Sequence, residues 1–357
     1  MTKSKVYYTP VKSCASQEEL AIALKKLISQ SKLFSALKPE GKTAVKMHFG
    51  EEGNTGFVRP ELVRLICDEA KKKSADVFLS DTNALYRGRR TNSQEHLALA
   101  KEHGFSKDSV GVEIVIPEDT KKENIEEVRI RQKFIDVARI ARVFMQADNI
   151  VAISHFKGHI MAGFGGALKN IGMGCAARSG KLAQHSDVSP VVYQAKCSGC
   201  GACVKICPAQ AIRIENKKSV INGLKCLGCA SCIAVCPNAA IDVNWESGGR
   251  DLQKKMAEYA YAVLKNKKAC IFFNFAVKIT KECDCLAKDD PRIAPDLGIL
   301  ASFDPVSVDQ ASLDLVNNAC CRDIFQELHP NRDGSTQLKY ANSLGIGSLD
   351  YQLIECS

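Results

Sequence analysis

The 357-residue sequence lacks three features that would each assign it to a broad class. It has no run of about eighteen apolar residues, the length needed to cross a membrane as a helix. Its first five residues lead directly into an apolar strand, without the apolar core of a signal peptide. Its lysines and arginines are scattered, with no basic stripe and no interleaved aromatic residues. These absences predict a cytoplasmic protein with no membrane and no nucleic acid among its partners.

Cysteine is the abundant residue, with 17 in the chain. Eight of them form two runs of the pattern C-x2-C-x2-C-x3-C-P between Lys196 and Pro237. The first run is Cys197, Cys200, Cys203 and Cys207, and the second is Cys226, Cys229, Cys232 and Cys236. Three thiolates spaced in this way lie on one tight loop and bind three corners of a [4Fe–4S] cube. The fourth begins a short helix and points away from its own loop, toward a second cube.

The tandem runs resemble the bacterial two-cluster ferredoxins. The resemblance implies crossed ligation by the two runs. One cluster would be held by Cys197, Cys200, Cys203 and Cys236, and the other by Cys226, Cys229, Cys232 and Cys207. A pair of zinc sites is the alternative, although zinc ribbons use pairs of cysteines rather than triplets. Two such clusters would lower the net charge from +9 to about +5 and suit an anaerobic cytoplasm.

The first 190 residues alternate strand and helix patterns, which is typical of an α/β layer with a largely parallel sheet. Strands are predicted at 6–8, 43–47, 76–80, 112–116 and 149–154, and helices at 16–28, 60–73, 93–103 and 137–147. The helix at 16–28 follows a capping box, Ser16-x-x-Glu19. His48, Asp81 and His155 fall at predicted strand ends, where such sheets bind ligands.

The alternation resumes after the cysteine runs, with helices at 251–265 and from Asp304 to 317 and strands at 270–275 and 297–301. The predicted architecture is therefore an α/β host with an inserted two-[4Fe–4S] ferredoxin-like (α+β) module. Residues 1–190 and 246–357 would form the host and residues 191–245 the module. A separate C-terminal domain at 246–357 is the alternative that the patterns leave open.

A second group of motifs lies just upstream of the cysteine runs: Ser154-His-Phe-Lys-Gly-His159 and a glycine-rich stretch from Gly163 to Cys175. Further on come Cys283-Asp-Cys285 and Asp304-Pro-Val-Ser-Val-Asp309. With these motifs, nearly all of the chain resembles the iron–sulfur-centre proteins that carry domain of unknown function 362. That resemblance implies no established reaction.

The chain also resembles the nickel-pincer lactate racemases over a short stretch. His159, the segment Ala162-Gly-Phe-Gly-Gly166, Lys169 and His185 fall at the intervals of that family. The resemblance implies that Lys169 carries a cofactor, that His185 binds a metal and that His159 is an acid/base. The racemases' other catalytic histidine has no clear counterpart here, because its region aligns near residues 83–90. A nickel cofactor, or another metal or organic cofactor, therefore stays open.

Each candidate residue outside the two cysteine runs also has a plainer interpretation. The glycines Gly163, Gly165 and Gly166 and the nearby Asn170 are predicted to bind an anion or cofactor at a helix N-terminus, although a tight packing turn would use the same glycines. His155, His159, Lys169 and His185 are predicted to be catalytic, with polar core packing or surface exposure as the alternative.

The pair Cys283 and Cys285 is predicted to bind metal or to do redox chemistry. Cysteines so close in sequence are expected to be poorly placed for a disulfide. On an extended segment their thiols would point the same way. Packing as small buried hydrophobes is the alternative. We expect both to lie near one pocket formed by His155, His159, Lys169 and His185.

Three functions follow from these predictions. The first is an iron–sulfur oxidoreductase that passes single electrons to a site in the α/β cleft, with a small anionic substrate. The others are an electron-transfer subunit that docks a partner enzyme, and a redox or metal sensor. The first two imply a redox partner protein or a ferredoxin-reducing enzyme. A ferredoxin alone needs far fewer residues than this chain has, which favours a second site in the remainder.

Overall fold

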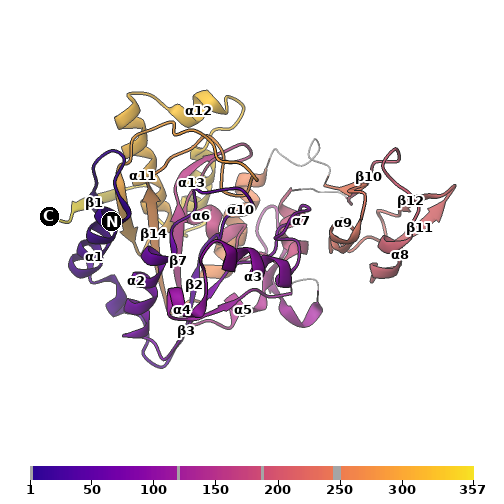
Figure 1. The fold of residues 1–357 in the computed structure, drawn as a ribbon, viewed down its shortest axis with the longest axis horizontal. Coiled ribbons are helices and arrows are strands. Elements are labelled where there is room, and N and C mark those ends of the chain that lie inside the picture. Colours follow the sequence, from indigo (N-terminus) through magenta and orange to yellow (C-terminus); the bar gives the residue numbers. More distant parts are fainter. Residues whose placement is uncertain (1–2, 119–120, 186–188, 244–250) are drawn as a thin grey trace.

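The computed structural model describes residues 3–118, 121–185, 189–243 and 251–357 (Figure 1). Its centre is an eight-stranded sheet in the order β16-β1-β15-β14-β7-β2-β3-β4. The strands are β1 (Ser4–Pro10), β2 (Lys42–Lys46), β3 (Asp76–Ser80), β4 (Glu113–Val115), β7 (Asn149–His155), β14 (Ala269–Ala276), β15 (Gly298–Ser302) and β16 (Tyr351–Glu355). Strands from both sides of the cysteine runs therefore lie in one sheet.

The sheet is mixed but largely parallel, which confirms the predicted α/β class. The strands β14, β7, β2, β3 and β4 run parallel to their neighbours in that block. The exception is β15, which is antiparallel to both β1 and β14. Every residue of β7 is buried, as expected where helices cover both faces of a parallel sheet.

Helices cover both faces of this sheet, and successive strand residues pack into opposite cores. Phe272 joins one core with α6 (Ala167–Gly172), α10 (Leu252–Leu264), α11 (Pro305–Cys320) and α13 (Ser335–Ser343). The next residue, Phe273, joins the other core with α1 (Gln17–Ser31) and α2 (Pro60–Lys71). The remaining helices of this part are α3 (Ser93–Glu102), α4 (Lys107–Val110), α5 (Arg142–Met145), α7 (Arg178–His185) and α12 (Ile324–Leu328), with two short 3-10 turns at Leu33–Ala36 and Lys122–Asn124.

Local signals placed several helices correctly. The hydroxyl of Ser16 accepts from the backbone N–H of Glu19, whose carboxylate accepts from the N–H of Ser16, so the predicted capping box is confirmed. Pro60 occupies the first turn of α2. None of the helices in the described ranges is long and apolar enough to cross a membrane.

The predicted helix at 137–147 is wrong. Residues 137–141 form β6 (Val137–Ala141), which pairs with β5 (Ile125–Arg129) in an antiparallel hairpin, and only the short α5 follows. The side chains of β6 alternate between half-buried and buried at its start, the two-residue period of a strand. Pairing with β5 satisfies the backbone groups that a helix would have satisfied internally.

The segment with the cysteine runs is built from small elements at one end of the molecule (Figure 1). The elements are β10 (Val191–Val192) paired with β13 (Ile241–Asp242), the hairpin β11 (Ile212–Glu215)–β12 (Lys218–Ile221), and the short helices α8 (Ala202–Ile206) and α9 (Ser231–Val235). Its own apolar cluster includes Cys203 and Cys232 and also takes in Leu85 and Leu182 from the main body. The domain division stays a prediction, and its boundary at 245/246 lies outside the described residues.

Candidate functional site

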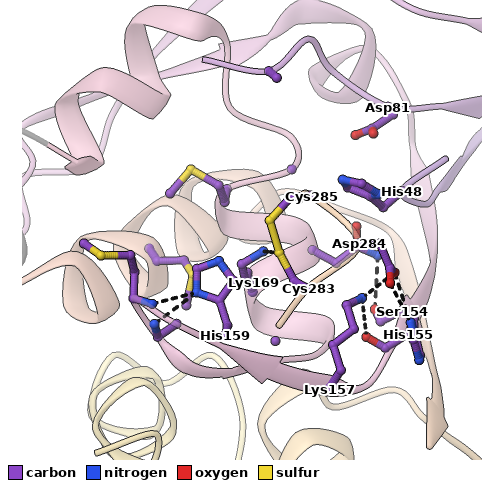
Figure 2. Close-up of a pocket in the computed structure, with 18 of the residues that line it drawn as sticks. His48, Asp81, Ser154, His155, Lys157, His159, Lys169, Cys283, Asp284 and Cys285 are labelled. Carbon is purple, nitrogen blue, oxygen red and sulfur yellow. Dashed lines mark hydrogen bonds and ion pairs between the residues drawn. A yellow bond between two sulfur atoms is a disulfide. The ribbon is translucent and has the colours of Figure 1, made fainter. Parts of the chain in front are cut away.

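A cavity of about 340 Å³ lies at the carboxyl ends of three neighbouring parallel strands (Figure 2). Lys46 ends β2, Asp81 follows β3 and His155 ends β7, and all three line this cavity. Carboxyl ends of parallel strands share one edge of a sheet, which is where α/β proteins bind ligands. The predicted candidates His155, His159, Lys169, His185, Cys283 and Cys285 all line it, so their expected convergence is confirmed. Their chemical roles stay predictions.

Lys46 and Asp81 form a buried ion pair at the floor of the cavity. The ammonium of Lys46 lies 2.9 Å from Asp81 Oδ1 and also donates to Asn170 Oδ1 at 2.9 Å. Burial alone would raise the pKa of Asp81, but the charges of Lys46 and of the other nearby basic groups together outweigh it, and the pKa is lowered. The amide of Asn170 in turn donates to the carbonyl of Ile153 and the hydroxyl of Ser154. Asn170, a predicted cofactor ligand, thus ties α6 to the ends of β2 and β7.

Asp284 is held by Lys157 and His155 on the other side of the cavity (Figure 2). Its carboxylate lies 2.7 Å from Lys157 Nζ and 3.0 Å from His155 Nδ1. Burial would raise the pKa of Asp284, but His155 and Lys157 outweigh burial and depress it. The second ring nitrogen of His155 lies 2.8 Å from the carbonyl of Val277. Both ring nitrogens of His155 therefore already have oxygen partners within the protein.

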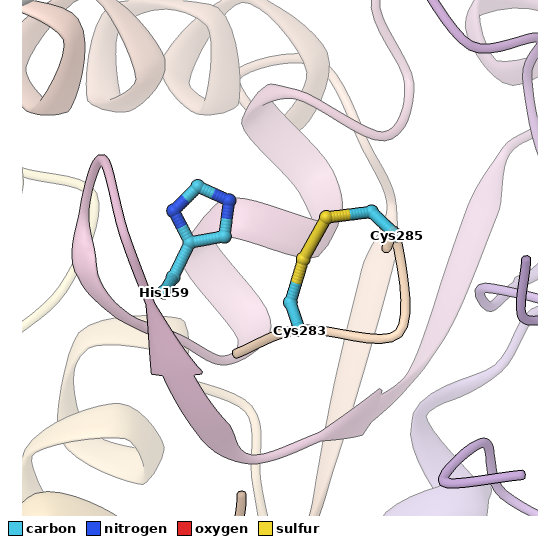
Figure 3. Close-up of side chains that lie close together, drawn as sticks. All are labelled: His159, Cys283 and Cys285. Carbon is cyan, nitrogen blue, oxygen red and sulfur yellow. A yellow bond between two sulfur atoms is a disulfide. The ribbon is translucent and has the colours of Figure 1, made fainter. Parts of the chain in front are cut away.

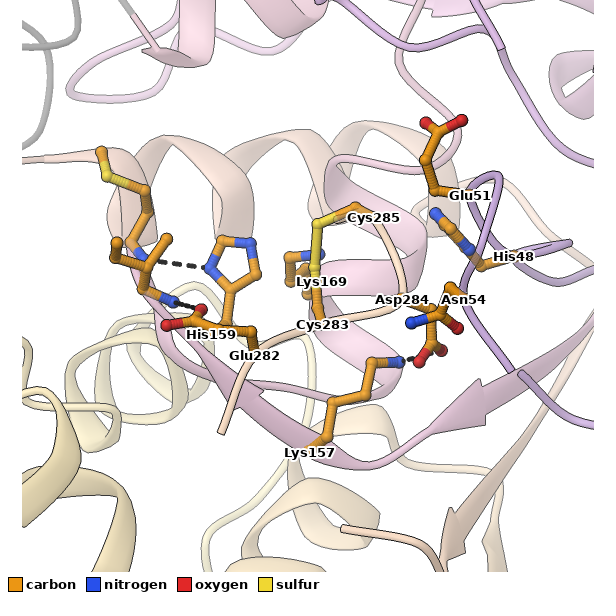
Figure 4. The surroundings of a disulfide bond; sticks show 12 residues. His48, Glu51, Asn54, Lys157, His159, Lys169, Glu282, Cys283, Asp284 and Cys285 are labelled. Atoms are coloured by element: carbon orange, nitrogen blue, oxygen red, sulfur yellow. Dashed lines mark hydrogen bonds and ion pairs between the residues drawn. A yellow bond between two sulfur atoms is a disulfide. The ribbon is translucent and has the colours of Figure 1, made fainter. Parts of the chain in front are cut away.

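Cys283 and Cys285 are joined by a disulfide, so the expectation that their closeness prevents one is wrong. The chain bends enough to bring their α-carbons to 5.2 Å, within the range that disulfides use. Both sulfurs lie on one side of the segment, toward the cavity, and the carboxylate of Asp284 between them points to Lys157 (Figure 4). This part of the expectation, two thiols facing the same way, is confirmed.

His159 lies beside this disulfide (Figure 3). One ring nitrogen of His159 and the sulfurs of Cys283 and Cys285 lie within 4.8 Å of one another, a grouping that could hold a metal ion only with the disulfide reduced to thiolates. The Nδ1 atom of His159 accepts from the backbone N–H groups of Met161 and Ala162, each at 3.1 Å. Burial and then the charge of Lys169 hold the pKa of His159 well below its usual value, so the ring is neutral.

Lys169 reaches the cavity from α6, and its Nζ lies 4.0 Å from Cys283 Sγ. Gly165 leaves space for the lysine stem, because a β-carbon there would lie 3.0 Å from the δ-carbon of Lys169. Within the described ranges, Lys169 makes no ion pair with a carboxylate. Burial and then the nearby charge of Lys157 lower the pKa of Lys169 to about 7. A neutral amine is therefore present at neutral pH.

We expect competitive acetylation of Lys169 to show an inflection near pH 7, far below the usual lysine value of about 10.4. The neutral amine is the nucleophile, so labelling should rise as pH passes through this value and then level off. Peptide mass spectrometry across a pH series measures it. The exposed Lys72 is the internal control, since the hydrogen bond that it donates to Glu69 raises its pKa. Parallel pH profiles for the two lysines would contradict the prediction.

Two further histidines line the cavity. Burial and then Lys169 lower the pKa of His185 to about 3. The Nδ1 of His48 accepts from the N–H of Gly50 at 3.0 Å, so its neutral ring carries the proton on Nε2. That Nε2 is inaccessible to solvent and has no hydrogen-bond partner among the described residues. A buried donor facing a cavity is a contact point for a ligand.

The N-terminus of α6 already holds an internal carboxylate, while cofactor binding by Gly165, Gly166 and Asn170, which line the cavity, stays a prediction. The first two N–H groups of α6, those of Ala167 and Leu168, donate to the carboxylate of Asp309 at 2.6 and 2.9 Å. Gly166 allows this approach, because a β-carbon there would lie 2.2 Å from Asp309 Oδ1. Gly163 has φ +78° and packs against the backbone around Gly334, away from the cavity lining. The glycine-rich stretch is therefore shaped by packing and by an internal carboxylate.

Sequence reasoning missed several residues of the site. Arg90 lines the cavity and pairs with Glu51 at 2.9 Å, while also donating to the hydroxyl of Tyr86. Lys157 lies inside the Ser154–His159 motif, and Asp284 stands between the candidate cysteines Cys283 and Cys285. An acidic residue between two candidate cysteines was the available signal for Asp284. No local pattern marks Arg90, whose partner lies 39 residues away.

The two cysteine runs approach each other in the middle segment. A second, small cavity is lined by Cys207 of the first run together with Cys226, Cys229 and Cys232 of the second. At the other end of the segment, Asn238, two residues after Cys236, donates to the hydroxyl of Ser198 at 2.8 Å. Several sulfurs accept backbone N–H groups, for example Cys207 from Ala211 and Cys236 from Ala240. The last cysteine of the first run therefore lies with the first three of the second, and the residues just after Cys236 contact the first run.

The fold and these groups define a cysteine-rich α/β protein with a cavity lined by basic side chains at the carboxyl edge of its sheet. The chain belongs to the family described as domain of unknown function DUF362, whose model matches residues 43–314. No curated protein matches it.

Two solved structures are similar. The lactate racemase apoprotein from Thermoanaerobacterium thermosaccharolyticum is 17% identical, with 77% of this chain and 51% of that chain covered and a TM-score of 0.42. A structural-genomics protein from Thermotoga maritima is 14% identical, with 90% and 61% covered and a TM-score of 0.44. The chain thus spans about half to three-fifths of these two proteins.

Proposed function

We propose that the protein is an iron–sulfur oxidoreductase, in which residues 197–236 carry electrons singly and the cavity of the α/β part binds the substrate. The observation that carries this proposal is the grouping of Cys207 with Cys226, Cys229 and Cys232 around one small cavity. Four thiols from two separate runs meet there, which suits four-cysteine ligation of a cube. A pair of independent zinc sites would not bring a cysteine of one run to the other.

The residues present fit two [4Fe–4S] clusters in the crossed arrangement. Cys226, Cys229, Cys232 and Cys207 would hold one cluster, and Cys197, Cys200, Cys203 and Cys236 the other. When bound, such clusters supply one-electron transfer. The backbone N–H groups that point at the sulfurs of Cys207, Cys226, Cys197 and Cys236 would stabilise the negative charge there.

One loop of the main body supports transfer between the middle segment and the cavity. Leu85 lines the cavity and packs in the apolar cluster that contains Cys203 and Cys232. The next residue, Tyr86, donates its hydroxyl to the carbonyl of Cys285 at 2.5 Å. Arg87 donates to the carbonyl of Pro237, directly after Cys236, at 2.6 Å. Three consecutive residues thus contact both the cysteine runs and the disulfide segment.

The charges of the cavity favour a small anionic substrate. Its lining includes five basic side chains and two carboxylates: Lys46, Arg90, Lys157, Lys169 and Lys181 against Asp81 and Asp284. The two carboxylates are already paired with Lys46 and Lys157. Lys169 and the donor on His48 remain for the ligand. A carboxylate or phosphate group would give both a partner.

A second function, an electron-transfer subunit that docks a larger enzyme, is favoured by the surface of the middle segment. Large apolar side chains are exposed there, with Leu224 fully exposed and Leu227 at 60%. Ile206 and Tyr193 add to this surface. Exposed apolar side chains gathered on one small unit are typical of a docking face. In either function, we propose that a redox partner protein or a ferredoxin-reducing enzyme docks on this surface.

Analysis of anaerobically purified protein tests the proposal. We expect about eight irons and eight acid-labile sulfides per chain, together with the absorbance of [4Fe–4S] clusters. Zinc in place of iron would contradict it. The same sample, analysed for other metals and extracted for organic cofactors, decides whether the cavity holds a further cofactor. Stable co-purification with a larger enzyme, and an empty cavity, would favour the second function.

A further inference from the structure

We propose that the Cys283–Cys285 disulfide is a redox-active couple that stores, as a dithiol, two electrons delivered one at a time by the iron–sulfur segment. Chemistry in the cavity would then use two electrons at a time, although the iron–sulfur segment delivers them singly. This inference rests on the proposed function for its electron source, but the disulfide chemistry has a readout of its own.

The disulfide is placed for reaction rather than for holding the fold together. It closes a loop of only three residues, so it constrains the unfolded chain very little. Its sulfurs face the cavity, and Cys285 is only half-buried. A disulfide in an accessible cavity, with little structural effect, is of the labile kind that serves redox chemistry.

The segment that carries the disulfide is held from several sides. The backbone N–H of Glu51 donates to the carbonyl of Asp284 at 2.9 Å, and Tyr86 donates to that of Cys285. The side chain of Asp284 is anchored by Lys157 and His155. Because Asp284 is fixed, the two sulfurs stay at the same edge of the cavity whether or not they are bonded.

The hydrogen bonds of His159 favour a thiol partner over a metal ion. Its Nδ1 accepts two backbone N–H groups, so in the neutral ring the proton lies on Nε2. Metal ligation through Nε2 would move this proton to Nδ1, against the N–H groups of Met161 and Ala162. With its proton on Nε2, the ring donates a hydrogen bond instead. The sulfurs of Cys283 and Cys285 lie within 4.8 Å of one of its ring nitrogens.

The step balances as a two-electron reduction. Two electrons and two protons break the S–S bond and form two S–H bonds. Each electron comes from one of the two [4Fe–4S] clusters, which is oxidised by one electron, and the protons come from solvent. Leu85 packs with Cys203 and Cys232, and the adjacent Tyr86 donates to the carbonyl of Cys285, so these two residues connect the cysteine runs to the disulfide segment. Reoxidation by a two-electron acceptor returns the disulfide.

A reductive titration of the holoprotein tests the couple. Anaerobic protein titrated with dithionite should take up about four electron equivalents, two for the clusters and two for the disulfide. The double variant Cys283→Ser/Cys285→Ser should take up about two, with its iron content unchanged. The matched control Cys320→Ser/Cys321→Ser removes two neighbouring cysteines that are free thiols in the structure and should titrate like wild type.

Alkylation locates the electrons. Trypsin releases the peptide Glu282–Lys288, in which Cys283 and Cys285 are the two cysteines. Under denaturing alkylation this peptide should stay unmodified in oxidised protein and gain two labels after dithionite reduction. In cluster-free protein, prepared by removing iron, the peptide should gain both labels after treatment with a phosphine reductant. Dithionite should reduce the disulfide of that protein far more slowly.

The outcomes separate the two proposals. Equal electron uptake by wild type and the Cys283→Ser/Cys285→Ser variant, or a peptide that is alkylated without reduction, would overturn the redox couple and leave the oxidoreductase standing. A reducible disulfide in a chain that binds no iron would overturn both the proposed function and delivery by clusters.

Discussion

Replacing Cys236 with serine is expected to remove the cluster held by Cys197, Cys200 and Cys203, and to leave the cluster beside it in sequence intact. The fourth cysteine of each run serves the other run in the proposed arrangement. The contact from Asn238 to Ser198 supports it, because it brings the residues after Cys236 to the first loop. Iron should fall from about eight to about four per chain.

The identity of the lost cluster is read by alkylation of the native protein. Trypsin releases Cys197–Lys205, a peptide with three cysteines of the first run. In Cys236→Ser these should react, while Cys226, Cys229 and Cys232 stay protected. The matched variant Cys207→Ser should give the reverse pattern. Reaction of Cys226, Cys229 and Cys232 in Cys236→Ser would show that each run serves its own cluster.

The second large effect is expected for Asp284→Ala, which should lower the free energy of unfolding by about 3–5 kcal/mol. The variant leaves Lys157 and His155 buried without their common acceptor, with 9% and 3% of their side chains exposed. Removing one partner of a buried pair exposes the full desolvation cost of the other. Urea denaturation of the anaerobic holoprotein, followed by circular dichroism, measures the change.

Two comparison variants separate charge from shape. Asp284→Asn keeps the size of the side chain and loses its charge, so it should lose most of the same stability. Asp68→Ala removes a pair with Arg64 that is about 40% exposed on both sides, and should change stability by less than about 1 kcal/mol. If Asp284→Ala lowered the free energy of unfolding no more than Asp68→Ala, the contacts of Asp284 with Lys157 and His155 would contribute little to stability.

The depressed pKa of Asp284 sets the direction of the pH effect. A carboxyl group whose folded pKa is below its unfolded value of about 3.9 stabilises the fold above that value. This contribution is present at neutral pH and is lost as pH falls from about 4 toward the folded pKa. Asp284→Asn should therefore be less sensitive to acid than wild type over this range.

The sequence by itself was enough for features that depend on neighbouring residues. The spacing of the cysteine runs, the capping box at Ser16 and the proline at the start of α2 act within one or two turns of chain, so the covalent backbone sets their geometry. Buried apolar runs likewise indicated β7 and β14, because a strand covered on both faces needs apolar side chains at every position. The candidate histidines and Lys169 were found by their motif.

Only the tertiary structure decided which distant groups meet. Asp309 caps α6 from about 140 residues away, and Asp284 reaches His155 across 129 residues. Such pairings depend on how helices and strands pack, and no local pattern carries that information. The same holds for β15, which lies between β1 and β14 and runs antiparallel to both. The disulfide likewise depends on a bend that brings the α-carbons of Cys283 and Cys285 to 5.2 Å. Glu51 and Tyr86, which are distant in sequence, hold this bend by hydrogen bonds to the carbonyls of Asp284 and Cys285.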